Sequence, residues 1–191
     1  YFDFSGYIDM ALGASIFVGI QLPINFNKPY LTSSLTDFWR NWHITLSRWF
    51  KDYVYIPLGG SKNKKIITYR NLLVTMGLAG LWHGASWNFI IWGILNGLVL
   101  CFEKMFNLYN NKSILRYIIN ILIIFNLWVV FRITEMSKFT LYITKLYSSF
   151  LSVFSITNFF IILFVVLMIL TQKIDNFISI KNLSKKINIT S

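Results

Sequence analysis

Residues 77–88 read Gly-Leu-Ala-Gly-Leu-Trp-His-Gly-Ala-Ser-Trp-Asn and place a histidine, His83, inside a long apolar run. No charged side chain interrupts this run between Leu72 and Phe102, and Glu103 follows directly. A segment this long and apolar belongs in a lipid bilayer or in a large protein core. An ionisable group is expensive to place there, so the pattern predicts a functional role for His83. A histidine that only makes a structural hydrogen bond in a packed helix bundle is the alternative, and it stays open at this point.

The surroundings of His83 depend on whether the run is one helix or two. Residues 71–102 number 32, whereas one crossing of a bilayer takes about 20 residues and two take about 40. We therefore expect either one long tilted helix or two shorter helices that meet near Gly84. In one continuous helix, Ala79, Gly80, Ser86 and Trp87 would share the face of His83, because neighbours three and four positions apart lie together.

Composition indicates an all-α integral membrane protein. Of the 191 residues, 55% are hydrophobic and only 13% are charged, while soluble domains contain about 45–50% apolar and 25% charged residues. The net charge is +11, but the basic residues border apolar spans and alternate with aromatic residues. This arrangement favours anionic lipid head groups over nucleic acid as the partner. The lone Cys101 excludes an internal disulfide and a cysteine metal cluster, and no metal-ligand spacing is present.

The segment 35–50 predicts an amphipathic helix that lies in the membrane interface. Its apolar residues follow the three-and-four spacing of one helical stripe, and basic residues occupy the other side. Ser34, followed three positions later by Asp37, is typical of a helix N-cap. His43 falls at the edge of the stripe, where a histidine is usually only solvated.

The remaining chain predicts further membrane spans and basic connections. Residues 115–131 and 156–170 are short apolar spans without ionisable groups at their centres, which we interpret as scaffold. We expect a single membrane domain, with the informative motifs in 1–103 and with spans and a basic tail in 104–191. If the run around His83 returns to the side where it began, the basic loops gather on the cytoplasmic side. The chain opens inside an apolar segment, so we expect it to be a piece of a longer multi-pass protein.

Four ordered motifs carry a resemblance to a known family. They are Tyr-Phe-Asp-Phe-Ser-Gly-Tyr-Ile-Asp-Met at 1–10, Phe-Trp-Arg-Asn-Trp-His-Ile-Thr-Leu-Ser-Arg-Trp at 38–49, Tyr-Ile-Pro-Leu-Gly-Gly at 55–60 and Leu-Trp-His-Gly-Ala at 81–85. With these motifs the chain resembles the membrane-bound O-acyltransferase family. The likeness is greatest to its bacterial branch that acetylates alginate or peptidoglycan, with relatives that D-alanylate teichoic acid. It runs from Tyr1 to about Glu103; beyond that only the hydropathy pattern agrees.

The resemblance implies a fold, a location and a reaction. The fold would be a polytopic helix bundle with interfacial amphipathic helices and a central funnel or tunnel, and this chain would be its C-terminal part. The location would be the bacterial cytoplasmic (inner) membrane. The reaction would move an acyl group, here acetyl, from a cytoplasmic thioester such as acetyl-CoA or an acyl carrier to a hydroxyl. O-acetylation of an extracytoplasmic polysaccharide would follow through a partner protein, without a bound cofactor.

The resemblance also implies roles for particular residues. His83 occupies the position of the family's essential histidine, and His43 matches a second histidine of this branch. A hydroxyl is a weak nucleophile at neutral pH, so the reaction gains from a base, and burial would keep an imidazole neutral and ready to accept a proton. His43 would orient a substrate or stabilise developing charge, while an acyl-histidine intermediate stays open. Further substrate contacts are expected from Trp39, Arg40, Asn41, Trp82, Trp87 and Asn88.

Two other classes of function remain alternatives. A transporter or channel subunit could use His83 in a proton relay. That reading predicts further ionisable groups along the spans 115–131 and 156–170, which contain none at their centres. A purely structural membrane subunit is the third reading.

Overall fold

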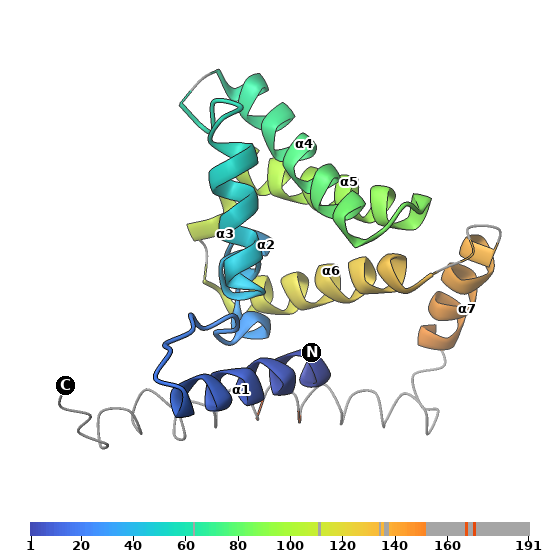
Figure 1. Ribbon diagram of the computed structural model, residues 1–191. Coiled ribbons are helices and arrows are strands. Elements are labelled where there is room, and N and C mark those ends of the chain that lie inside the picture. The colour runs from blue at the N-terminus through green and yellow to red at the C-terminus, as the bar shows by residue number, and fades with distance from the viewer. Residues whose placement is uncertain are drawn as a thin grey trace. The chain divides into compact units, whose positions relative to one another are not determined.

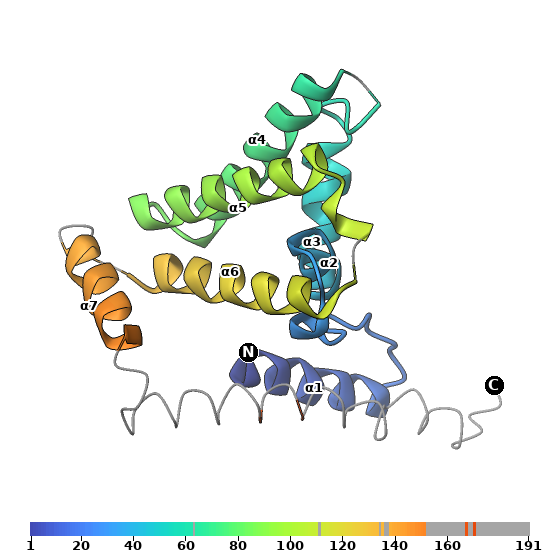
Figure 2. The same ribbon diagram turned by 180° about the vertical axis from the view of Figure 1, so that it is seen from behind.

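The structure is a computed structural model that describes residues 1–62, 64–110, 112–133, 135, 138–151, 167 and 170. All regular secondary structure among the described residues is helical, with no β-strand, which confirms the all-α prediction. The chain divides into two compact units, Tyr1–Phe139 and Thr140–Ser191. The first unit contains all the motifs named above (Figures 1 and 2).

The longest connection between helical elements of the first unit is the segment 18–28. The elements are α1 (Phe2–Phe17), the 3₁₀-helix η1 (Pro29–Leu31), α2 (Leu35–Asn41), α3 (Ile44–Phe50), the π-helix η2 (Lys51–Tyr55), α4 (Lys65–His83), α5 (Trp87–Met105), the 3₁₀-helix η3 (Leu108–Asn110) and α6 (Ile114–Arg132). Helix α7 (Phe139–Leu151) begins at the boundary of the second unit.

The predicted amphipathic helix over 35–50 is in fact two helices, so the prediction of one continuous helix was wrong. The chain leaves α2 at Trp42 and re-enters a helix only after His43, which adopts the left-handed conformation with φ 43° and ψ 55°. The predicted cap is confirmed, because the backbone N–H of Asp37 donates to Ser34 Oγ over 3.1 Å. His43 therefore occupies the junction between two helices instead of the edge of one helical stripe.

The run around His83 forms the second of the two expected arrangements, a hairpin of two helices. Helices α4 and α5 lie side by side and run in opposite directions (Figures 1 and 2). Helix α4 ends at His83 because the next residue, Gly84, has φ 152°, a conformation that side-chain-bearing residues rarely adopt. Ser86 is the N-cap of α5. The shared helical face of His83, Ser86 and Trp87, which one continuous helix would have produced, is therefore not formed.

Glycines let the two helices of this hairpin approach each other closely. A Cβ on Gly80 would lie against the backbone carbonyl of Phe89, and a Cβ on Gly93 would lie against that of Met76. Small residues at such positions allow the backbones of membrane helices to pack directly. This packing fixes the position of the end of α4, and with it His83.

Helix α6 confirms the predicted helical span over 115–131. By length and composition, α5 and α6 are the two described helices that could cross a membrane. The predicted span over 156–170 and the basic tail fall outside the described residues, apart from Leu167 and Leu170. Both stay predictions.

A buried carboxylate ties α2 to the two apolar helices. Glu103 of α5 is 2% exposed and accepts hydrogen bonds from the backbone N–H groups of Leu35 and Thr36, over 2.7 and 3.0 Å, and from the Thr36 hydroxyl over 2.8 Å. Arg116 of α6 lies 3.5 Å from the same carboxylate. Free N–H groups and a positive dipole end make a helix N-terminus a good partner for an anion. Glu103 thereby holds the start of the helix that carries Trp39 and Arg40.

Candidate active site

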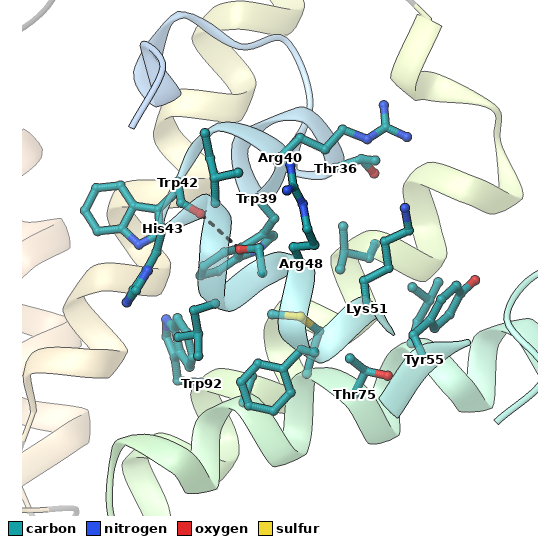
Figure 3. A pocket seen from close by; sticks show the side chains of 18 of the residues that line it. Thr36, Trp39, Arg40, Trp42, His43, Arg48, Lys51, Tyr55, Thr75 and Trp92 are labelled. Carbon is teal, nitrogen blue, oxygen red and sulfur yellow. Dashed lines mark hydrogen bonds between the residues drawn. The ribbon is translucent and has the colours of Figure 1, made fainter. Parts of the chain in front are cut away.

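A cavity of about 920 Å³ lies among the helices of the first unit, and both histidines line it. Helices α2 to α6 and η2 all contribute to its wall, and Phe4 adds to it from α1. His43 lies with Trp92 in one part of the cavity, while Arg40, Arg48 and Lys51 extend into another part (Figure 3). The cavity is large enough for a drug-sized ligand, because such pockets span about 300–1,000 Å³.

His83 stands against a wall of aromatic rings. Its ring centroid lies 4.9 Å from that of Phe131 and 5.3 Å from that of Trp92, with the planes close to perpendicular. Phe89 adds a third ring at 5.9 Å. The residue itself is exposed in this chain, so the aromatic wall shields the imidazole from one side only. The burial expected for this imidazole is therefore not found, and its sequence neighbours Leu81, Trp82 and Trp87 are exposed as well.

His43 is half-buried and is held by the segment that precedes α2. Its Nδ1 lies 3.3 Å from Asn25 Oδ1, and its ring packs against Phe4 with centroids 4.9 Å apart. Burial lowers the pKa of His43 below the usual value, because a protonated imidazole loses solvation there. Trp82 links the two histidines, with its ring 4.9 Å from that of His83 and 6.4 Å from that of His43.

Basic and phenolic side chains line the same cavity. The cations come from α2, α3, η2 and α5, and they are Arg40, Arg48, Lys51 and Lys104. Tyr55 and Tyr109 add hydroxyl groups. Guanidinium and ammonium groups bind phosphate and carboxylate well, so this part of the cavity suits an anionic ligand. Among the described residues, no group of three His, Cys, Asp or Glu side chains could hold a metal ion.

The expected substrate contacts divide into two sets. Trp39 and Arg40 line the cavity, and the Trp39 indole N–H is held by Asn96 Oδ1 over 3.2 Å. The other four do not line it: they are Asn41, Trp82, Trp87 and Asn88. Asn41 donates to the backbone carbonyl of Asp37 over 2.8 Å.

Trp87 and Asn88 have surroundings of their own at the start of α5. Trp87 is 70% exposed. Asn88 is buried and donates to the carbonyl of Phe131 over 3.1 Å, which joins α5 to α6.

Three aromatic residues of α5 and α6 that line the cavity were not singled out from the sequence. Trp128 and Phe131 belong to α6, which the sequence presents as scaffold, and the structure adds that this end of the helix lines the cavity. Trp92 is 2% exposed, and its indole N–H has no acceptor among the described residues. A buried donor without a partner is unusual in a folded protein and calls for an explanation. In the sequence, a tryptophan on the buried side of an apolar helix gives no signal that distinguishes a ligand-binding role from packing.

Fold and site together define the class of protein: an all-helical chain with helices apolar enough to cross a membrane and with two histidines on one ligand-sized cavity. The chain belongs to the membrane-bound O-acyltransferase family, whose model matches residues 1–144. This confirms the family resemblance, and the family places the chain among membrane-bound acyltransferases.

Curated relatives carry acyl-transfer names. The chain is 50% identical over 138 residues to a peptidoglycan O-acetyltransferase of Helicobacter pylori, covering 69% of this chain and 26% of the relative. It is 50% identical over 135 residues to the Azotobacter vinelandii protein named "Probable alginate O-acetylase AlgI", covering 69% and 27%. A teichoic acid D-alanyltransferase of Bacillus subtilis is 34% identical over 119 residues, covering 59% and 30%. The chain thus spans about a quarter of the length of the first two relatives.

Proposed function

We propose that the protein to which this chain belongs moves an acetyl group from a thioester to a hydroxyl, for O-acetylation of a polysaccharide outside the cytoplasm. The observation that carries the proposal is the meeting of His43 and His83 on one cavity in a chain of this family. The relatives named for peptidoglycan and alginate acetylation support acetyl as the group and a polysaccharide as the final acceptor.

His83 is the proposed general base. In the transfer step the hydroxyl oxygen forms a bond to the thioester carbonyl carbon, the carbon–sulfur bond breaks, and the proton passes through His83 to the leaving thiolate. The rings of Trp92 and Phe131 limit the access of water from one side, which favours the hydroxyl over hydrolysis. The same step could pass through an acetyl-histidine, with His83 as the nucleophile.

Two further groups can assist this step. The indole N–H of Trp92 would donate to the carbonyl oxygen as negative charge develops on it, since a preorganised donor there lowers the barrier. His43 would either orient one of the two substrates or stabilise the developing charge.

The basic part of the cavity supports a phosphate-bearing thioester, such as acetyl-CoA or an acyl carrier, as the donor. Arg40, Arg48, Lys51 and Lys104 provide cations that match phosphate groups. We propose that this donor binds from the cytoplasm and that the acetyl group leaves toward a partner protein on the other side of the inner membrane. The partner would complete the transfer to the polymer.

The test is O-acetyl analysis of the cell-surface polymers in a strain that lacks the gene. Loss of base-labile acetyl esters, restored by the full-length wild-type gene but not by His83→Ala, is the expected result. Immunoblotting of membranes checks that the variant is present at the wild-type level. Unchanged ester content in the deletion strain would contradict the proposal, and it is also the outcome that a proton-relay function predicts.

A further inference from the structure

The contact between Asn25 and His43 bears on the protonation of the imidazole as well as on its position. We propose that Asn25 holds His43 in the tautomer with its proton on Nδ1, so that Nε2 is left as a hydrogen-bond acceptor that aligns a substrate in the cavity. Asn25 is then a positioning residue for the transfer. This inference rests on the proposed function for its meaning, but the tautomer itself can be measured without turnover.

The amide of Asn25 can face this site in only one orientation. Its Oδ1 lies 3.1 Å from the backbone N–H of Thr45 and 2.6 Å from the Thr45 hydroxyl. A backbone N–H can only donate, so the atom opposite it must be the amide oxygen. A reversed amide would set its NH₂ group against another donor.

The proton on the imidazole follows from that orientation. An amide oxygen only accepts, so the nitrogen that faces it, Nδ1 of His43 at 3.3 Å, is the one that carries hydrogen. A neutral imidazole has one such hydrogen, which leaves Nε2 with a free lone pair. The hydrogen bond is long, and the same oxygen also accepts from Thr45. A ring nitrogen without hydrogen would still be unfavourable here, because two acceptors would face each other.

Two backbone hydrogen bonds hold Asn25 and His43 in place relative to each other. The N–H of Ile44 donates to the carbonyl of Asn25, and the N–H of Asn27 donates to the carbonyl of Asn41, each over 3.0 Å. These two bonds join the 25–27 segment to both sides of the break at His43. The left-handed conformation of His43 is thus determined from outside the two helices.

An acceptor nitrogen assigns His43 to one of its two proposed roles. The single proton of the reacting hydroxyl goes to His83, so Nε2 can align a substrate through another of its N–H or O–H groups. Developing charge on the thioester oxygen needs a donor, which Nε2 is not in this tautomer. Trp92 lines the same cavity, and its indole N–H, which has no partner among the described residues, is the donor proposed above for that oxygen. The lowered pKa of His43 favours the neutral ring that this role requires.

The other charged or titratable side chains that share the cavity bear on any pH dependence of His43. From α4 there is His83, which interacts electrostatically with His43. From the remaining elements there are Arg40, Arg48, Lys51, Tyr55, Lys104 and Tyr109. On the sides away from these groups, α1 presents Phe4 to the ring and the preceding segment presents the uncharged Asn25.

The direct test reads the tautomer by ¹⁵N NMR of the full-length protein labelled at histidine. The signals that vanish in His43→Gln belong to His43, and the protonated and bare ring nitrogens have distinct chemical shifts. We expect the proton on Nδ1 in the wild type and a mixture of tautomers in Asn25→Ala. A proton on Nε2 in the wild type would overturn the proposal, even if acetyl transfer were confirmed.

The kinetic test compares Asn25→Ala with Asn27→Ala in membranes that hold the full-length protein. We expect Asn25→Ala to lower kcat by roughly tenfold or more with little change in KM for the donor. Asn27 is exposed, and Asn27→Ala keeps its backbone hydrogen bond, so this control should stay near the wild-type rate. Equal losses in both variants, or none in Asn25→Ala, would overturn the proposal.

Asn25→Asp separates positioning from mere packing. A carboxylate still accepts from Nδ1, so this variant should keep more of the rate than Asn25→Ala. Its negative charge stabilises the imidazolium and raises the pKa of His43 relative to the wild type. The acidic limb of the kcat–pH profile should therefore move to higher pH; an unmoved limb would contradict the contact with His43. If wild-type membranes transfer no acetyl group, the proposed function fails, and the NMR result alone decides the tautomer.

Discussion

The two histidines of the cavity reach it from different kinds of backbone position. His83 is the last residue of α4, and Gly84 turns the chain immediately after it. His43 stands alone between α2 and α3 in a left-handed conformation. Because neither imidazole lies in the middle of a helix, each is fixed by contacts with other elements. The side chains that contact the two histidines therefore say as much about the site as the histidines do.

Trp92→Phe tests the role of an unpartnered donor. The substitution keeps an aromatic ring in the wall of His83 but removes the indole N–H, so we expect kcat to fall about 10²-fold while the amount of folded protein stays the same. The measurement is the rate of acetyl transfer in membranes with the full-length protein. Trp49 is half-exposed and does not line the cavity, so Trp49→Phe is the matched control. A wild-type rate in Trp92→Phe would restrict Trp92 to packing.

Some of these side chains could be predicted from the sequence and others could not. His83 stood out because it was an ionisable group in an apolar run, and the same reasoning applies to Glu103 at the end of that run. Asn25 gave no such signal, because its partners, His43 and Thr45, lie 18 and 20 positions away. In the sequence, a polar residue between prolines is typical of an ordinary loop. Only the fold brings His43 and Thr45 into contact with it.

Among the helices, the α4–α5 hairpin depends most on small residues, and Gly93→Ala tests this. The added Cβ would meet the carbonyl of Met76, so one helix must move. We expect a loss of about 1–3 kcal/mol in the free energy of unfolding, measured as a lower melting temperature of the purified full-length protein. At Gly77 a Cβ would meet only the tip of Ile94 at 3.5 Å, so Gly77→Ala should be neutral or slightly stabilising. Equal effects at the two glycines would argue against close backbone packing.

Glu103→Gln tests the connection between α2 and the apolar helices. The amide NH₂ would face one of the two backbone N–H donors, and Arg116 would lose its partner. Removing one member of a buried ion pair costs about 3–5 kcal/mol, so a large drop in melting temperature is expected. Glu135 pairs with Lys138 at the surface, where such pairs contribute about 0–1 kcal/mol. If Glu135→Gln were as harmful as Glu103→Gln, burial of the carboxylate would not be the cause.

The break between α2 and α3 shows where sequence reasoning about elements ends. Apolar spacing over 35–50 fits one helix well, and the N-cap at Ser34 was predicted correctly. The break depends on the backbone hydrogen bonds that join Asn41 and Ile44 to the 25–27 segment, and no local sequence pattern predicts these bonds. By contrast, the length of the run 71–102 already limited it to two arrangements, one of which is the hairpin.

For the protein in its membrane, the hairpin predicts that the start of α4 and the end of α5 lie on the same side of the membrane. Cysteines introduced at Lys62, before α4, and at Lys112, after α5, should react with a membrane-impermeant reagent from the cytoplasmic face only. Basic residues near both positions favour that face. The measurement uses intact cells and inverted vesicles with the full-length protein, in a background without other reactive cysteines. Labelling of the two positions from opposite faces would mean that 71–102 crosses the membrane.

The proposed transfer requires that the imidazole of His83 takes part in the chemical step. Replacement by alanine leaves space for a free imidazole molecule beside the rings of Trp92 and Phe131. The decisive measurement is therefore the initial rate of acetyl transfer by full-length His83→Ala in membranes, with and without added imidazole. We predict that the variant is inactive and that imidazole restores part of the rate, increasingly as pH rises through about 7, where imidazole loses its proton. Transfer at the wild-type rate without imidazole would contradict the account.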